Sequence, residues 1–327
     1  MNATLRHGCL SLLVTAVVIV HTIPAGGTQY AGEPYHLGVG GRALGRGGAF
    51  TASDGDASSV FWNAAVLTQL ARPEVLIQHA ETFGALLNHE FVAFAVPPQH
   101  DGGWAWGGYL TYLGGSGIGL TVLDSATGRP RIDKNAGHAD WSLAVGIARR
   151  GGSWWSWGVT AKGVVRKLPG GDQIAANSAW GLGLDAAWWG RYRGGRFGIK
   201  IADLTSTFLS YASGREETIN PHVNWGGEFD LPGMADGLTT IVAAEAETYF
   251  ENRQGGAQYW SGSISVDLHV GFEAVYRDML FGRIGSDRGV LALGAGFASG
   301  HWGIDAALTD HEFLDDSYRV SLRYLFQ

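Results

Sequence analysis

The chain has 327 residues, of which 46% are hydrophobic and 16% charged, and its formal net charge is −7. It contains 51 glycines together with 13 Trp, 11 Tyr and 14 Phe, whereas soluble domains average about 25% charged residues and about 7% glycine. The aromatic content excludes a disordered glycine-rich chain, the scattered basic residues argue against nucleic acid as a partner, and the single Cys excludes a disulfide framework or a cysteine zinc site.

The first residues have the pattern of a secretory signal peptide. Arg6 and His7 precede the apolar stretch Cys9–Val20, and small residues follow at Ala25 and Gly26. This stretch is shorter than the about 20 residues that a membrane-spanning helix needs. We therefore predict a signal peptide over residues 1–26 that exports the chain across the inner membrane.

Residues 27–72 do not alternate in hydrophobicity, and they precede the first predicted strand. Gly38–Phe50 is rich in glycine, and Asp56 suits the N-cap of a helix that begins near it. Apolar residues of this helix fall on one face, namely Val60, Phe61, Ala64 and Leu67. We predict that the segment is a plug inside a barrel. Its candidate site residues are Asp54, Asp56, Phe61, Trp62 and Asn63.

From Glu74 onward, large apolar residues alternate strictly with small or charged ones, as in a strand that has two different faces. The predicted strands are about 9–13 residues long, which matches tilted strands that cross a membrane rather than soluble strands of about 5–6 residues. Aromatic residues such as Trp188 and Trp189 stand near strand ends, where interface girdles belong. The pattern predicts an all-β fold, an antiparallel transmembrane barrel of about fourteen strands over residues 73–327.

The predicted connections differ in length on the two sides of the membrane. Short turns fall on the periplasmic side, and the long loops Gly114–Ala139 and Thr205–Pro221 fall on the other. This asymmetry is typical of bacterial outer-membrane barrels. The last strand alternates up to Phe326, and it resembles the closing-strand signal that the barrel-assembly machinery recognises. We predict an outer-membrane location, with lipid and that machinery as partners.

A group of charged residues in the strands falls on the predicted inward face. A lipid-facing Arg or Lys at mid-depth would cost about 2–4 kcal/mol, so these charges must line the lumen if the barrel is correct. The candidate lumen-facing residues are Lys162, Asp185, Lys200, Asp267, His269, Glu273 and Arg283, with Glu245, Asp305, Arg319 and Arg323 on the same face. They could bind the backbone of the plug, the head group of a ligand, or each other.

The segments Gly41–Ala52 and Asp56–Asn63 resemble the N-terminal signature of the PorV/PorQ outer-membrane barrels, which are relatives of the FadL fatty-acid transporters. The resemblance implies a fourteen-strand barrel with an N-terminal plug, serving either type IX protein secretion or uptake of hydrophobic compounds. The chain departs from the family pattern Asn-Pro-Ala-Gly, because Asn63 is followed by Ala64, Ala65 and Val66. The turn after the helix is therefore expected to differ.

No catalytic motif accompanies these features. The sequence lacks the nucleophile elbow, the phosphate-binding loops and the His-Glu-x-x-His zinc motif. We therefore predict a non-enzymatic protein without catalytic residues, cofactor or metal. The main interpretation is a PorV/PorQ-like barrel that supports protein secretion or cargo handling at the cell surface, with secreted protein as its partner. The alternative is a FadL-like passive transporter of hydrophobic small molecules.

Overall fold

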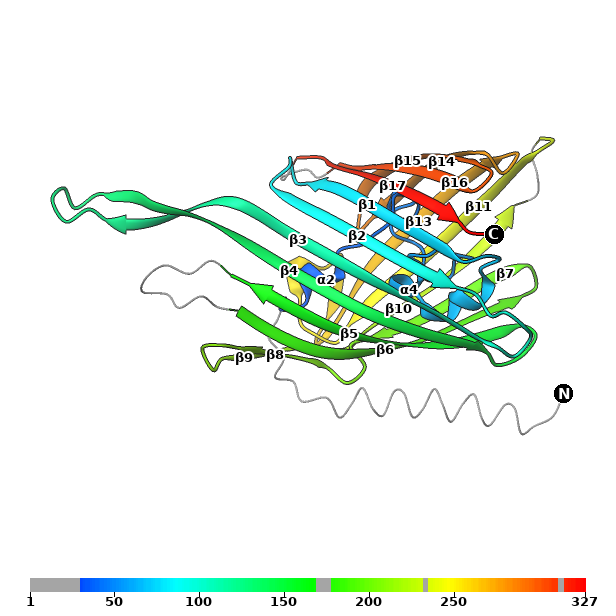
Figure 1. Cartoon of the computed structure of the whole chain (residues 1–327), viewed down its shortest axis with the longest axis horizontal. Coiled ribbons are helices and arrows are strands. Elements are labelled where there is room, and N and C mark those ends of the chain that lie inside the picture. The colour runs from blue at the N-terminus through cyan, green and yellow to red at the C-terminus, as the bar shows by residue number, and fades with distance from the viewer. Residues whose placement is uncertain (1–29, 169–177, 232–234, 311–314) are drawn as a thin grey trace.

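The structure, a computed structural model, describes residues 30–168, 178–231, 235–310 and 315–327. Its strands form one antiparallel sheet that closes on itself, because β1 (Glu74–Thr82) pairs with both β2 (Leu87–Val96) and β17 (Ser317–Leu325). The result is a closed barrel of 14 strands, which confirms the predicted fold class (Figure 1). The predicted signal peptide lies outside the described residues.

The wall between β2 and β17 follows chain order. Its other strands are β3 (Trp104–Leu123), β4 (Pro130–Arg150), β5 (Trp155–Lys167), β6 (Ser178–Tyr192), β7 (Gly195–Ala202), β10 (His222–Leu231), β11 (Leu238–Tyr249), β13 (Ile264–Tyr276), β14 (Leu280–Asp287), β15 (Val290–Ser299) and β16 (Trp302–Thr309). The shorter strands β8 (Thr207–Tyr211), β9 (Glu216–Ile219) and β12 (Tyr259–Ser261) add to this wall.

The alternation along each strand separates an outer apolar surface from the interior. On β4, Leu143 is 62% exposed while its neighbours Ser142 and Ala144 are buried. On β13, the outward Leu268 is 40% exposed and the adjacent Asp267 is 1% exposed. Large apolar side chains that water would disfavour thus cover the outside of the barrel, and a hydrocarbon environment would satisfy them.

The prediction of a loop over Gly114–Ala139 is wrong. β3 and β4 instead continue as a paired hairpin to Leu123 and Pro130, well beyond the rest of the barrel (Figure 1). Asp124 closes its tip by accepting the backbone N–H groups of Ala126 and Thr127. Both faces of this extension are largely exposed, so the two-faced hydrophobic pattern used to find strands is not required there.

The expected loop Thr205–Pro221 also contains strands. β8 continues the line of β7 by pairing with β6, and β9 returns antiparallel to β8. A turn separates β7 from β8, with positive φ at Asp203 (52°) and Ser206 (56°). This break matters below because it places Asp203 at the inner surface of the wall.

The N-terminal segment lies inside the barrel as short helices rather than one long helix. They are α2 (Glu33–His36), α3 (Gly41–Gly45), α4 (Ser59–Trp62) and the 3₁₀ helix η1 (Ala64–Gln69), while the 3₁₀ helix η2 (Gln254–Gly256) belongs to a loop. The single helix expected from near Asp56 is wrong, because Asn63 is extended (φ −162°, ψ 99°) and separates α4 from η1. No helix in the described part of the chain is long and apolar enough to cross a membrane.

Contacts with the wall come from both halves of the segment. Helix α3 contacts β14, β15, β16 and β17, whereas η1 contacts β3, β4, β5 and β6. The segment therefore reaches opposite sides of the barrel interior.

Candidate functional site

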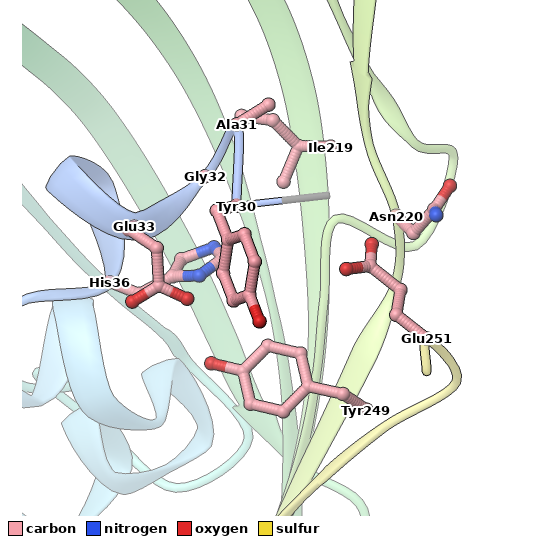
Figure 2. A pocket seen from close by; sticks show the side chains of 9 residues that line it. All are labelled: Tyr30, Ala31, Gly32, Glu33, His36, Ile219, Asn220, Tyr249 and Glu251. Carbon is pink, nitrogen blue, oxygen red and sulfur yellow. The ribbon is translucent and has the colours of Figure 1, made fainter. Parts of the chain in front are cut away.

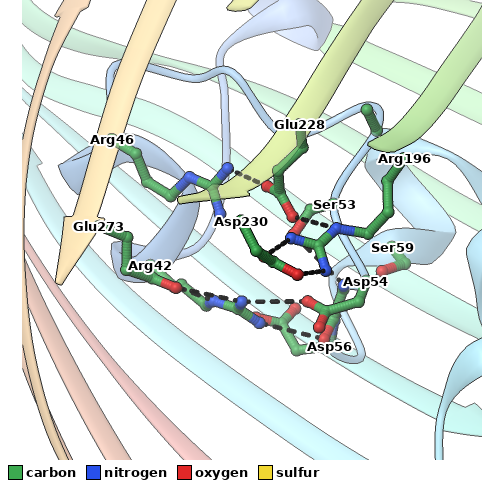
Figure 3. Close-up of polar contacts among 12 residues, drawn as sticks. Arg42, Arg46, Ser53, Asp54, Asp56, Ser59, Arg196, Glu228, Asp230 and Glu273 are labelled. Atoms are coloured by element: carbon green, nitrogen blue, oxygen red, sulfur yellow. Dashed lines mark hydrogen bonds and ion pairs between the residues drawn. The ribbon is translucent and has the colours of Figure 1, made fainter. Parts of the chain in front are cut away.

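The N-terminal segment is joined to the wall by buried ion pairs, shown in Figure 3. The guanidinium of Arg46 is fully buried and pairs with Glu228 of β10, whose side chain is 1% exposed. Arg196 of β7 also pairs with Glu228, with 2.8 Å between Nε and Oε1. Two arginines from different elements thus share one carboxylate in the interior. Arg46 and Glu228 were absent from the candidate residues, although Arg46 lies within the Gly41–Ala52 signature, because nothing local to either residue indicates its partner.

Arg42 connects the segment to a second group of wall charges. Its Nη2 donates to Asp54 at 3.2 Å and to Glu273 at 3.4 Å. Glu273 also accepts from Arg283 at 2.5 Å, and Arg283 donates to Asp305 at 2.6 Å. Burial alone would raise the pKa of the Asp54 carboxyl, but the nearby Arg42 guanidinium outweighs burial, and the pKa is lowered. Asp54 is therefore charged at neutral pH and holds Arg42 in place.

Wall side chains also bind backbone N–H groups of the segment. Glu245 of β11 accepts from the N–H of Phe50 at 2.9 Å and from that of Thr51 at 2.8 Å. Gln78 of β1 accepts from Gly40, and Ser321 of β17 accepts from Gly41 at 2.8 Å. These bonds satisfy donors that would otherwise be buried without partners.

Asn63 uses both ends of its amide. Its Oδ1 accepts from the N–H of Ala65 at 3.0 Å, while its Nδ2 donates to the carbonyls of Thr51 at 2.8 Å and Trp188 at 3.0 Å. The Trp188 carbonyl belongs to β6, so this side chain joins the turn after α4 to the wall. In the pattern Asn-Pro-Ala-Gly the residue after Asn is Pro, which has no N–H. The N–H that Asn63 accepts here belongs to Ala65, the second residue after it, so this hydrogen bond does not depend on whether position 64 is Ala or Pro.

The assignment of Trp189 to the aromatic girdle at the membrane interface is wrong. The indole of Trp189 points inward and is 2% exposed, with its Nε1 donating to the carbonyl of Ala52 at 2.9 Å. Trp188, the preceding residue, lies on the opposite face, because successive side chains of a strand alternate. Trp188 therefore lies on the outer face of β6 and Trp189 on its inner face.

Glycines on the inner wall let backbones approach each other. A Cβ on Gly198 of β7 would lie 2.0 Å from the carbonyl oxygen of Thr51, and one on Gly285 of β14 would lie 2.4 Å from the carbonyl carbon of Arg46. Both distances are too short for any side chain. Part of the high glycine content is thus explained by close packing of the segment against the wall.

The inner face was predicted to carry small or polar residues, and part of it also carries large apolar side chains. Over β1–β4 it carries an apolar cluster next to inward polar residues such as Glu74, Gln78 and His89. In this cluster the phenyl ring of Phe61 from α4 packs edge-on against Phe91 of β2 and Tyr109 of β3, with ring centroids 6.3 and 5.6 Å away. The wall residues of this cluster, which we call the apolar sector, are Leu76, Phe91, Ala93, Ala95, Ala105, Tyr109, Ala144 and Ala148. The segment covers them with Val39, Ala57, Val60, Phe61, Ala64 and Leu67. The interior therefore has an apolar sector, bordered by polar residues of the same strands, and a charged side formed by the ion-paired residues of the later strands.

The other predicted residues lie inside the barrel and contact each other or the segment. Trp62 donates from its indole to the carbonyl of Val39, and Asp56 accepts from the N–H and hydroxyl of Ser58. Lys200 donates to the carbonyl of Phe61 at 2.7 Å.

The strand residues make similar contacts. Lys162 lies 2.9 Å from both Asp185 and Asp203. On β13, Asp267 pairs with Arg253, and His269 contacts the carbonyl of Gly47 at 3.0 Å. Of the three roles left open for the inward charges, the structure shows two, namely pairing with each other and binding the segment.

A cavity of about 180 Å³ lies at the end of the barrel where the C-terminus is found. It is lined by Thr68 and Leu70 after η1, and by wall residues Pro98, His100, Asp101 and Arg150. The cavity adjoins the C-terminal end of the segment that fills the interior.

Comparisons with known proteins identify the fold. No family model matches the chain, and no curated protein matches it. The toluene transporter TbuX of Ralstonia pickettii superposes with a TM-score of 0.58 at 14% identity, covering 90% of this chain and 100% of that one. The toluene transporter TodX of P. putida gives 0.60 at 11% identity, covering 89% and 99%. A FadL homologue of Pseudomonas aeruginosa gives 0.52 at 13%, covering 87% and 98%. The chain thus has the fold of FadL-type outer-membrane transporters.

Proposed function

We propose that the protein is a passive outer-membrane channel for small hydrophobic molecules, with the N-terminal segment as its plug. The observation that supports this most is the apolar sector, an aromatic and aliphatic strip along the inner wall of β1–β4 that Phe61 of the segment covers. The similarity of fold to transporters of toluene agrees with it. Transport proteins of this kind are not enzymes, and the outer membrane is their location.

The route follows from the division of the interior. A hydrophobic solute makes no favourable contacts with the charged side. In the apolar sector it gains about 25 cal/mol for each Å² of apolar surface that is removed from water. Displacing Phe61 exposes Phe91 and Tyr109 to such a solute without breaking the ion pairs of Arg42 and Arg46. The cavity beside Leu70 then provides the exit toward the periplasm.

Protein secretion, the main interpretation from the sequence, has no support from the comparisons. The resemblance to PorV/PorQ barrels rests on the residues of the segment, and these now have a structural reason to be present, since they pack the segment against the wall. The alternative interpretation is therefore the one we carry forward.

The experiment is uptake of a labelled monoaromatic hydrocarbon by Gram-negative cells that lack their own hydrophobic-compound channel. Expression of the protein should raise uptake, and Phe91→Gln should lower it because the polar amide interrupts the apolar sector. Glu245→Gln, on the charged side, is the matched control and should not lower uptake. Equal uptake with and without the protein, or equal loss in both variants, would refute the proposal.

A further inference from the structure

A second cluster lies near the start of the described N-terminal segment and takes no part in the proposed route. It consists of His36 at the end of α2, Asp203 in the turn after β7 and His222 at the start of β10. One ligand atom from each residue lies within 4.8 Å of the other two. We propose that these three side chains bind a divalent transition-metal ion such as Zn²⁺, which fastens the N-terminal segment to the wall.

The distances suit a metal of this size. His36 Nε2 and Asp203 Oδ2 are 3.3 Å apart. Ligand atoms on a tetrahedron with bonds of about 2.1 Å lie about 3.4 Å from each other, so the pair already has the required separation. Two imidazoles and one carboxylate favour Zn²⁺ and its neighbours over Mg²⁺ or Ca²⁺, which prefer oxygen ligands.

His222 provides an independent indication of a ligand. Its side chain is 4% exposed, and its Nδ1 is buried without a hydrogen-bond partner among the described residues. Its Nε2 faces Glu247 at 3.3 Å. A carboxylate on one imidazole nitrogen fixes the tautomer and leaves the other nitrogen free to bind a metal. A buried nitrogen without a partner is costly unless something occupies it.

Contacts with the wall also fix the orientation of the Asp203 carboxylate. Its Oδ1 accepts from the hydroxyl of Thr207 at 2.5 Å and lies 2.9 Å from Lys162 Nζ. These contacts hold one carboxylate oxygen and leave Oδ2 directed at His36. The ring of His222 stacks on Tyr249 with centroids 4.7 Å apart, which fixes its plane.

Space for a fourth ligand adjoins His36. A cavity of about 10 Å³ is lined by His36 together with Tyr30, Glu33, Tyr249 and Glu251, and Figure 2 shows these side chains around it. That volume is about one water molecule. Three protein ligands and a water bound beside His36 would complete a tetrahedral site.

Binding of Zn²⁺ to the purified full chain in detergent, after treatment with a chelator, tests the site. We expect one Zn²⁺ per chain, no competition by excess Mg²⁺, and an X-ray absorption spectrum with two imidazole ligands. His36→Gln and Asp203→Asn should each weaken binding by at least about tenfold. His79→Gln is the matched control, because His79 is exposed and far along the chain from the cluster, and it should bind like the parent.

Two readouts keep the test decisive if a variant folds poorly. Heat-modifiable migration on gels reports whether each variant forms the barrel, and only variants that do so are compared. Added Zn²⁺ should also protect residues 33–45 from hydrogen exchange in the parent and not in His36→Gln. Absence of stoichiometric binding, or equal binding by the parent, His36→Gln and Asp203→Asn, would overturn the proposal. Hydrocarbon uptake is measured separately, so failure of the metal site can be told apart from failure of the proposed function.

Discussion

Replacing Glu228 by Gln should release the plug from the wall. The substitution keeps the shape of the side chain but removes the charge that pairs with Arg46, and both side chains are 1% exposed. Breaking a buried pair in this way costs about 3–5 kcal/mol, because an unpaired charge stays in the interior. The guanidinium of Arg46 has no other hydrogen-bond partner among the described residues, since its Nε and Nη1 are unpaired. Arg196 keeps Asp230, so the cost falls mainly on Arg46.

The cost translates into a change in plug release. Because about 1.4 kcal/mol is a factor of ten in an equilibrium constant, the equilibrium constant for release should rise by about 140- to 3700-fold. The assay is the rate at which a cysteine at position 43 reacts with a maleimide. Ala43 is 1% exposed, and the one natural cysteine, Cys9, lies in the predicted signal peptide. Labelling should therefore report exposure of α3.

Two control variants make the reasoning refutable. Arg46→Leu should accelerate labelling less than Glu228→Gln, because Glu228 would still pair with Arg196 at 2.8 Å. The double variant Arg46→Leu/Glu228→Leu should label more slowly than Glu228→Gln, because no uncompensated Arg46 charge remains. If Glu228→Gln labels at the parent rate, or if the two single variants are reversed in order, the ion pair does not hold the plug.

Three further expectations concern the faces of the barrel and the plug. Leu268→Arg should impair insertion, because it places a charge against hydrocarbon at about 2–4 kcal/mol, whereas Asp267→Asn should insert almost normally; equal damage in a heat-modifiability gel would mean that the faces are reversed. Deleting residues 27–72 should leave the barrel able to insert and raise its conductance in planar bilayers, and unchanged conductance would remove the plug from the proposal. Asn63→Ala removes the donor to the carbonyls of Thr51 and Trp188, so it should weaken the plug by about 1–3 kcal/mol, measured by the same cysteine labelling without loss of heat modifiability.

The candidate site was only partly predictable, because its contacts join distant parts of the chain. The inward direction of Asp185 and Glu273 followed from alternation, since a period of two fixes which face a residue occupies. Their partners did not follow, because pairing across the barrel depends on which strand stands opposite. Arg46 is separated from Glu228 by 182 positions, and His36 is separated from Asp203 by 167. No local spacing could indicate either contact, and the sequence accordingly predicted no metal.

By itself, the sequence determined the barrel. Alternating hydrophobicity and strand length reflect local geometry and the thickness of a membrane, and both can be read along one strand. The interior was decided only by the tertiary structure. Asn63 adopts an extended conformation that interrupts the expected helix, and its amide binds the carbonyl of Trp188 on the wall. The tertiary structure also supplies the Ala52 carbonyl that accepts the N–H of the inward Trp189. Closure of the sheet brings β1–β4 and their apolar residues beside one face of the segment, and only that closure divides the lumen into an apolar sector and a charged side.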